Sequence, residues 1–143
     1  MNSQKTLLMI KPDAVRRDLI GEILSRVEKQ KFKIVDLKMV RLSVDYAKRF
    51  YQIHQEKPFF ADLIDSITSG PVVAVLLEKE NAVEYLRRVV GKTDPQESEK
   101  GTIRSDLGLD VTRNSVHASD SEETAKFEID LFFSKKLNSS DVD

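Results

Sequence analysis

The sequence predicts an α+β sandwich in which helices pack on a β-sheet. Two observations carry this prediction. Short apolar or alternating segments of strand type are interleaved along the chain with amphipathic segments of helical period. No internal linker or repeat divides the 143 residues, a length that suffices to bury one sizeable core. We therefore expect a single domain spanning residues 1–143, with a polar and flexible tail at 138–143.

Three segments have the pattern of strands. TLLMI (6–10) is a short segment, apolar after Thr6, that ends before Pro12, as expected of a buried strand. KIVDLKMVRL (33–42) alternates, which predicts that its apolar positions 35, 37 and 39 face the core and that positions 36 and 38 face solvent. VVAVLL (72–77) follows a turn at 69–71 and reads as a second fully buried strand.

Helical spacing and capping residues predict five helices. The first covers 20–30, and the second follows Ser43 as N-cap. Pro58 suits the first turn of a helix over 58–67. Asn81 is placed to cap a helix over 82–90, which Gly91 ends. The last helix is expected over 121–136, with an apolar stripe at positions 125, 129 and 132.

Residues 92–114 show little periodicity and are expected to form a long loop. A loop of this length within a compact domain is either a wrong assignment or a functional segment. A short strand at 115–117 fits between this loop and the final helix.

Composition excludes several classes of function. The chain has 23 basic and 24 acidic residues, and this balance disfavours dedicated nucleic-acid binding, which depends on excess positive charge. It has no cysteine, so disulfides, thiolate metal sites and cysteine nucleophiles are ruled out. Neither a signal peptide nor a membrane span is evident, so a cytoplasmic enzyme or binding module is expected.

No glycine-rich phosphate loop is present. Gly91-Lys92-Thr93 resembles the end of a P-loop, but the glycine required five positions earlier is replaced by Leu86. Any bound phosphate must therefore be held by a few convergent cations. Lys11, at the end of a buried strand, either reaches the rim or points into a site. Arg104 lies in the long loop, where guanidinium groups commonly bind phosphate oxygens.

The two histidines differ in their surroundings. His54 has polar neighbours and no metal-ligand spacing, and we interpret it as a surface residue. His117 lies in NSVHASDS, where Ser119 and Glu122 have the spacing of a capping box and Ser121 can also cap. Glu128 falls further along the same helix, so its carboxylate could accept one ring N–H and leave the other nitrogen free to attack. From these residues alone, a structural and a catalytic role for His117 remain equally open.

Phe59 and Phe60 form an aromatic pair at a helix start. Most such residues belong to the core. One of two adjacent helical positions usually faces outward, however, and an exposed ring there could stack on a nucleobase without reading its identity.

Six motifs together resemble the nucleoside diphosphate kinase family. They are TLLMIKPDAV, HQEKPFF, SGPVVAV, RVVGKTDP, KGTIRSDLG and NSVHASDS, in compatible order and spacing over residues 4 to 134. The resemblance implies a ferredoxin-like βαββαβ sandwich with an antiparallel four-stranded sheet. It also implies ping-pong transfer of the γ-phosphate of a nucleoside triphosphate, mainly ATP, to a nucleoside diphosphate. In such a reaction His117 would carry the phosphate on its δ nitrogen.

The same resemblance implies roles for further residues. Glu128 and Ser119 would support His117, and Lys11 would be both catalytic and nucleotide-binding. The remaining nucleotide-binding residues would be Tyr51, Phe59, Leu63, Arg87, Thr93, Arg104, Val111 and Asn114. Phe59 and Val111 would sandwich the base with Leu63 beside it, and Asn114 would contact the ribose. Mg²⁺ would bridge the nucleotide phosphates, with no metal ligand from the protein. The implied assembly is a homo-oligomer, hexamer or tetramer.

Two departures from the family pattern stand out. Ala118 and Ala14 occupy positions where many relatives have glycine. If position 118 required a positive φ, alanine would cost about 1 kcal/mol or more there. The alternative to an active kinase is a catalytically silent nucleotide-binding or scaffold protein of the same fold.

Overall fold

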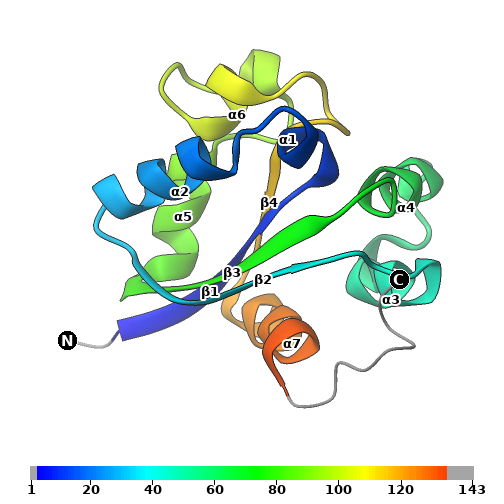
Figure 1. The fold of residues 1–143 in the computed structure, drawn as a ribbon, viewed down its shortest axis with the longest axis horizontal. Coiled ribbons are helices and arrows are strands. Elements are labelled where there is room, and N and C mark those ends of the chain that lie inside the picture. Colours follow the sequence, from blue (N-terminus) through cyan, green and yellow to red (C-terminus); the bar gives the residue numbers. More distant parts are fainter. Residues whose placement is uncertain (1–2, 135–143) are drawn as a thin grey trace.

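A four-stranded antiparallel sheet forms the centre of the molecule (Figure 1). The computed structural model describes residues 3–134, so the predicted tail at 138–143 lies outside the described residues. The strands are β1 (Ser3–Ile10), β2 (Lys33–Val40), β3 (Val72–Glu80) and β4 (Val116–Ala118), in the order β2-β3-β1-β4. This confirms the predicted α+β fold and its antiparallel sheet.

Helices cover both faces of the sheet (Figure 1). One face carries α1 (Pro12–Arg16), α2 (Ile20–Lys29), α5 (Ala82–Val90) and α6 (Ile103–Leu107), and the other carries α3 (Val44–Phe50), α4 (Phe60–Ile67) and α7 (Glu122–Phe133). Two short 3₁₀ turns, η1 (Gln52–His54) and η2 (Pro95–Glu97), lie in the connections. Along β1, Leu8 and Ile10 join the core on the first face, whereas Leu7 and Met9 join the core on the second. A strand buried on both sides favours apolar residues on both faces, which explains the continuous apolar run LLMI at positions 7–10.

The prediction for the second strand was right in position and wrong in burial. Val35, Leu37 and Met39, expected to face the core, are 41%, 46% and 55% exposed. Within residues 3–134 the strand is at the edge of the sheet and pairs only with β3, with a register shift between Ile34 and Asp36. A bulge of this kind changes the alternation, and an edge strand leaves side chains uncovered.

The segment 92–114 is not the continuous loop that was expected. It contains η2 and α6, each started by a side chain that accepts a backbone N–H: Asp94 from Gln96 at 3.0 Å and Thr102 from Ser105 at 3.2 Å. A helix of five residues is too short to show a helical period in the sequence. Capping residues were therefore the only local signal.

Helix boundaries differ from the expectations in detail. Helix α4 begins at Phe60, so Pro58 precedes it. Asn81 occupies the N-cap of α5 with a φ of 53°, but its side chain makes no capping hydrogen bond. Gly91 ends α5 as predicted, with a φ of 93°, and a Cβ there would come within 2.0 Å of the Ser98 hydroxyl oxygen. Glycine is therefore required at this position. None of the described helices is long and apolar enough to cross a membrane.

Candidate active site

A cleft of about 440 Å³ opens beside the carboxyl end of β1 and the short strand β4. Its walls come from Lys11 directly after β1, from η1, α4, α5 and the residues that follow α5, and from α6, β4 and the segment between them. Ten residues that the sequence predicted for the site line this cleft: Lys11, Tyr51, Phe59, Leu63, Arg87, Thr93, Arg104, Val111, Asn114 and His117. The two other predicted residues, Ser119 and Glu128, lie behind His117.

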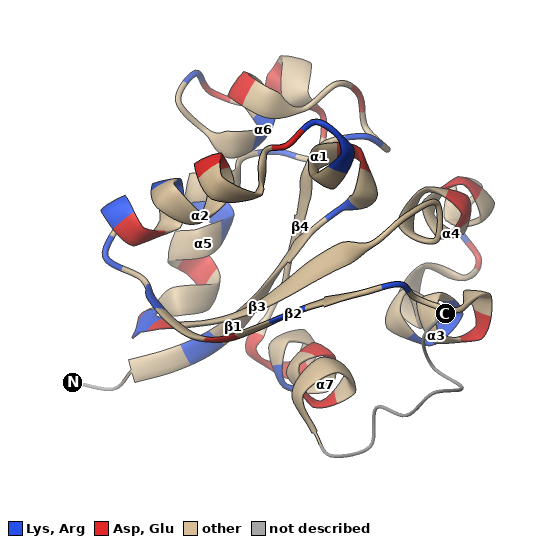
Figure 2. Cartoon of the chain, viewed as in Figure 1, with Lys and Arg blue, Asp and Glu red and all other residues tan. Residues whose placement is uncertain are grey.

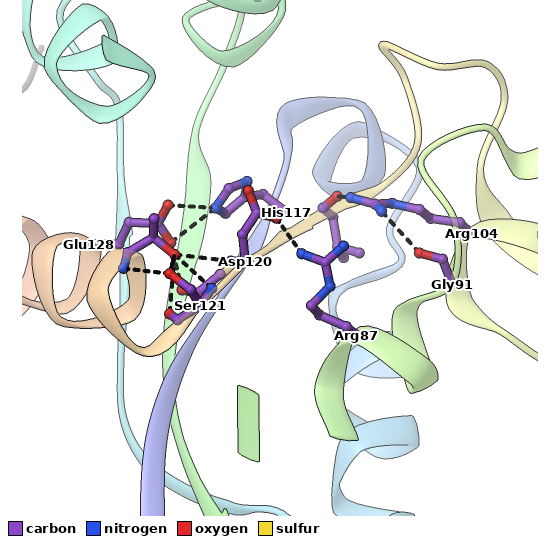
Figure 3. Close-up of polar contacts among 10 residues, drawn as sticks. Arg87, Gly91, Arg104, His117, Asp120, Ser121 and Glu128 are labelled. Atoms are coloured by element: carbon purple, nitrogen blue, oxygen red, sulfur yellow. Dashed lines mark hydrogen bonds and ion pairs between the residues drawn. The ribbon is translucent and has the colours of Figure 1, made fainter. Parts of the chain in front are cut away.

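The imidazole of His117 is held from behind by a buried carboxylate (Figure 3). The ring atom Nε2 lies 3.0 Å from both carboxylate oxygens of Glu128. Ser119 donates its hydroxyl to the same carboxylate at 2.6 Å. Because a carboxylate only accepts hydrogen bonds, this contact assigns a proton to Nε2. In the neutral form of the ring, Nδ1 then keeps its lone pair.

Aromatic rings fix the plane of His117. The ring of Phe50 packs edge-on at a centroid distance of 4.8 Å, and that of Tyr51 packs edge-on at 5.7 Å. Phe50 and Tyr51 are both buried, at the end of α3 and directly after it. The side chain of His117 remains 15% exposed and lines the cleft. This arrangement limits rotation of the ring and directs its free nitrogen away from Glu128.

Lys11 brings a buried cation to the cleft. It is 2% exposed, and its ammonium group donates to the Thr112 carbonyl at 2.6 Å and to Asn114 Oδ1 at 3.1 Å. Burial lowers the pKa of Lys11 to about 8, although the negative charge of Asp13 opposes this shift. The lysine at the end of the first strand therefore points into the site rather than to the rim.

Asn114 joins two walls of the cleft. Its side-chain amide donates to the carbonyls of Thr93 at 3.0 Å and Val111 at 3.1 Å. The same side chain accepts from Lys11. The residues after α5, the residues after α6 and the end of β1 are thus connected through one buried amide.

Two arginines face His117 across the cleft (Figure 3). Arg87, in the last turn of α5, forms an ion pair with Asp120. Arg104 donates to the carbonyls of Gly91 at 3.1 Å and Val116 at 2.9 Å. Burial lowers the pKa of Arg104 to about 10. Because this value is still well above neutral pH, the group remains cationic there.

The cations belong to the cleft and not to a broad basic surface. Lys and Arg residues are interspersed with Asp and Glu over the helices (Figure 2). Arg88, next to Arg87, pairs with Glu84 on the exposed side of α5, and Arg113 pairs with Asp110. An anion in the cleft would therefore meet Lys11, Arg87 and Arg104.

The mouth of the cleft is apolar. Phe59 and Val111 are 43% and 53% exposed, and Leu63 lies beside them on the cleft wall. Phe60 is half-buried against the core, so the outward position of the aromatic pair is Phe59. An exposed ring facing a cleft can stack on a flat aromatic ligand.

Two sequence-based interpretations are corrected. His54 is not a surface residue, because it is half-buried and lines the cleft, with its ring 5.9 Å from that of Phe59. Ser119 does not cap the last helix. Ser121 is the N-cap and forms the capping box with Thr124, which frees Ser119 to bind Glu128.

Sequence reasoning missed three contributors to the site. Asp120 pairs with Arg87, the Thr112 carbonyl accepts from Lys11, and Asp13 binds the backbone beside Asn114. The signal for Asp13 was its place directly after Lys11-Pro12 at a strand end. A backbone acceptor such as the Thr112 carbonyl cannot be predicted from residue type, because every residue has a carbonyl group.

The alanines at 14 and 118 adopt ordinary backbone conformations. Neither is among the described residues with positive φ, so the strain considered for Ala118 is absent. Ala14 is fully buried in α1. The positive φ in this region, 80°, belongs to Ser115.

Comparison with known proteins identifies the class. The family model "Nucleoside diphosphate kinase" matches residues 4–137. A nucleoside diphosphate kinase of Dehalococcoides mccartyi is 53% identical over 132 residues, which cover 92% of this chain and 93% of that protein. The solved structure of the Aquifex aeolicus nucleoside diphosphate kinase superposes with a TM-score of 0.89 at 38% identity, covering 99% of this chain and 100% of that chain. A halophilic nucleoside diphosphate kinase from Halobacterium salinarum, solved in complex with CDP, gives a TM-score of 0.89 at 38% identity, over 99% of this chain and 92% of that one.

Fold and cleft thus define a nucleotide-binding kinase, a transferase of the phosphotransferase type. The chain belongs to the nucleoside diphosphate kinase family. The predicted family and ferredoxin-like fold are confirmed.

Proposed function

We propose that this enzyme transfers the γ-phosphate of a nucleoside triphosphate, mainly ATP, to a nucleoside diphosphate through a phosphohistidine on His117. In the first half-reaction the Nδ1 lone pair attacks the γ-phosphorus, the bond from that phosphorus to the bridging oxygen breaks, and the diphosphate leaves with the electron pair. In the second, a terminal oxygen of another nucleoside diphosphate attacks the phosphorus, and the N–P electron pair returns to Nδ1. No external acid or oxidant is needed in either step.

The observation that carries this proposal is the contact of His117 Nε2 with Glu128 at 3.0 Å. The ring gains positive charge as Nδ1 binds phosphorus, and the buried carboxylate behind it stabilises that charge. Ser119 holds the carboxylate in position through a charge-assisted hydrogen bond of 2.6 Å.

The cations of the cleft fit the remaining requirement of phosphoryl transfer, which is positioning and neutralisation of charge on the phosphate oxygens. We propose that Lys11, Arg87 and Arg104 supply this charge, with the hydroxyls of Tyr51 and Thr93 as further phosphate contacts. We propose also that Lys11 and Asn114 contact the ribose hydroxyls. Phe59 and Val111 would hold the base between them beside Leu63. Stacking of this kind accepts any base.

Mg²⁺ is proposed to enter with the nucleotide phosphates as part of the substrate. The described residues contain no group of three or more His, Asp or Glu side chains able to hold a metal. Of the described residues that line the cleft, Asp120 alone carries a carboxylate, and it is paired with Arg87. Oxygen ligands from the phosphates suit Mg²⁺, and the ion would neutralise charge on the γ-phosphate.

We propose that residues 1–143 form one domain that works as a homo-oligomer, hexamer or tetramer, in the cytoplasm. The apolar residues Val35, Leu37 and Met39 on the edge strand β2 support assembly, because an unpaired, partly apolar edge is suited to contact with a second copy. The balanced charge supports the absence of dedicated nucleic-acid binding. Light scattering of the purified protein gives the subunit number, and a Met39→Glu variant should lower it.

The chain offers its own control for the function, because it has only two histidines. After incubation with radiolabelled ATP and Mg²⁺, we expect an acid-labile, base-stable phosphoprotein in the wild type. The phosphoprotein should persist in His54→Ala and disappear in His117→Ala. Phosphate transfer to several nucleoside diphosphates should be lost in His117→Ala as well. Transfer by His117→Ala at the wild-type rate would refute the proposal.

A catalytically silent nucleotide-binding protein is the alternative. It predicts binding of ADP without a phosphoenzyme. The complete cleft, with an oriented imidazole and three cations, favours the active kinase.

A further inference from the structure

A buried carboxylate lies beside the cleft without lining it. Asp13 is in the first turn of α1, two residues after Lys11, and only 3% exposed. Its Oδ2 atom accepts the backbone N–H of Ser115 at 3.1 Å. Its Oδ1 atom is also buried and has no hydrogen-bond partner among the described residues. Burial of a carboxylate with one free oxygen is unfavourable, so its presence requires a reason beyond packing.

Asp13 binds Ser115, a residue with a strained backbone directly before strand β4. Ser115 has a φ of 80°, which is uncommon for a residue other than glycine. Its N–H donates to Asp13, and its carbonyl accepts from the backbone N–H of Lys11 at 2.9 Å. Both backbone groups of Ser115 are thus bound to the segment 11–13. Ser115 follows Asn114 and precedes β4, which carries His117.

Asp13 is also the main negative charge acting on Lys11. The hydrogen-bond acceptors of the lysine are neutral, the Thr112 carbonyl and the Asn114 amide oxygen. Of the charges that shift its pKa, Asp13 has the largest effect, followed by Arg104 and then Asp110. Asp110 is only partly exposed, and its charge is neutralised by an ion pair with Arg113. Other charged or titratable groups around the pair are Arg17, Arg87, Arg113, Tyr51, His54, His117 and Asp120.

We propose that Asp13 is a positioning residue of the phosphotransfer site, which fixes the Asn114–Ser115 turn through its hydrogen bond and keeps Lys11 cationic through its charge. This inference rests on the proposed function, in which Lys11 binds the transferred phosphate. Asp13 itself touches neither phosphate nor base. Its two effects can be separated by substitution, because an amide retains the acceptor and loses the charge.

The charge has a measurable consequence in the pH profile. Burial lowers the pKa of Lys11 to about 8 in the presence of Asp13. The active form is the cation, so kcat/KM should fall as pH rises through this value. Burial raises the pKa of Asp13, and Lys11 together with the Ser115 N–H opposes that rise and favours the charged form. Without the negative charge, Lys11 would lose its proton at lower pH.

The deciding variants are Asp13→Asn and Asp13→Ala, compared with Asp65→Asn, an exposed carboxylate that does not line the cleft. For Asp13→Asn we expect the alkaline limb of kcat/KM to move down by about one pH unit, the size typical of one nearby charge. Well below the limb its kcat/KM should return to within about threefold of the wild type. Asp13→Ala, which also loses the acceptor, should be impaired at every pH. Asp65→Asn should keep the wild-type profile.

A limb that stays in place in Asp13→Asn would overturn the proposal, as would an equal loss of activity at all pH values. Binding of ADP with Mg²⁺, measured by calorimetry over the same pH range, needs no turnover. If the wild type binds ADP but forms no phosphoenzyme, the proposed function fails. The role of Asp13 is still decided, because the pH at which ADP affinity falls can be compared between the wild type and Asp13→Asn. Circular dichroism checks that each variant is folded.

Discussion

Replacement of Glu128 by glutamine is the sharpest perturbation of the histidine site. The substitution keeps the size of the side chain and removes its charge. The Gln amide N–H₂ can donate to Nε2 of His117, which would leave the ring proton on Nδ1, the atom proposed to attack. The variant therefore loses a stabilising charge and favours the wrong tautomer.

The magnitude follows from the separation of the two groups. Two unit charges 3.0 Å apart attract by about 5 kcal/mol at an effective dielectric constant of about 20. If the ring gains about half a charge in the transition state, the loss is about 2–3 kcal/mol. That corresponds to about a hundredfold slower phosphorylation, and the tautomer change adds to it. We expect kcat to fall by about 10² to 10⁴, with little change in ADP affinity.

Rapid mixing of enzyme with ATP and Mg²⁺, quenched in base, measures the phosphorylation step directly. Glu123→Gln is the matched control, because Glu123 is an exposed carboxylate in the same helix, α7. Phosphorylation of Glu128→Gln within about threefold of the Glu123→Gln rate would refute the electrostatic role assigned to Glu128.

Three further outcomes are expected. Lys11→Ala should lower kcat, because its charge matters most in the transition state, and steady-state kinetics showing only a raised KM would mean uniform binding instead. Phe59→Ala should weaken binding of purine and pyrimidine nucleotides by similar factors in calorimetric titrations, whereas a loss confined to purines would contradict stacking as its role. Ser121→Ala removes the cap of α7 and should cost about 1 kcal/mol of unfolding free energy in denaturant titrations, with phosphorylation preserved. Slower phosphorylation in Ser121→Ala, beside the loss of stability, would contradict this and show that the cap also supports the site.

Most of the fold could be predicted because its central strands have a simple pattern. VVAVLL and the LLMI part of TLLMI are continuous apolar runs, as expected of strands buried on both faces. The edge strand was harder, because alternation alone does not show whether a neighbour covers the apolar side. Its bulge and its place at the edge are properties of the whole sheet. Helix α6 was missed because five residues are too few to reveal a period.

The site was predictable where residue type carries the chemistry and not where the backbone does. His117, Glu128 and the cations were found from the resemblance and their side chains, and the structure gathers them around one cleft. The sequence could not choose between Ser119 and Ser121 as the cap, because the spacing of Ser119 from Glu122 also suits a capping box. His54 looked solvent-exposed from its polar neighbours, since nothing in YQIHQEK shows that the ring of Phe59 lies beside its own. The positive φ of Ser115 and its tie to Asp13 depend on contacts across 102 positions of sequence.

The measurement that most directly tests the central claim is nitrogen-15 NMR of the phosphorylated enzyme, with both histidines labelled. Coupling of phosphorus to the ring nitrogens identifies the atom that carries the phosphate. We expect phosphorus on Nδ1 of His117, with Nε2 still protonated and bound to Glu128. Phosphate on Nε2 of His117, or on His54, would contradict the account.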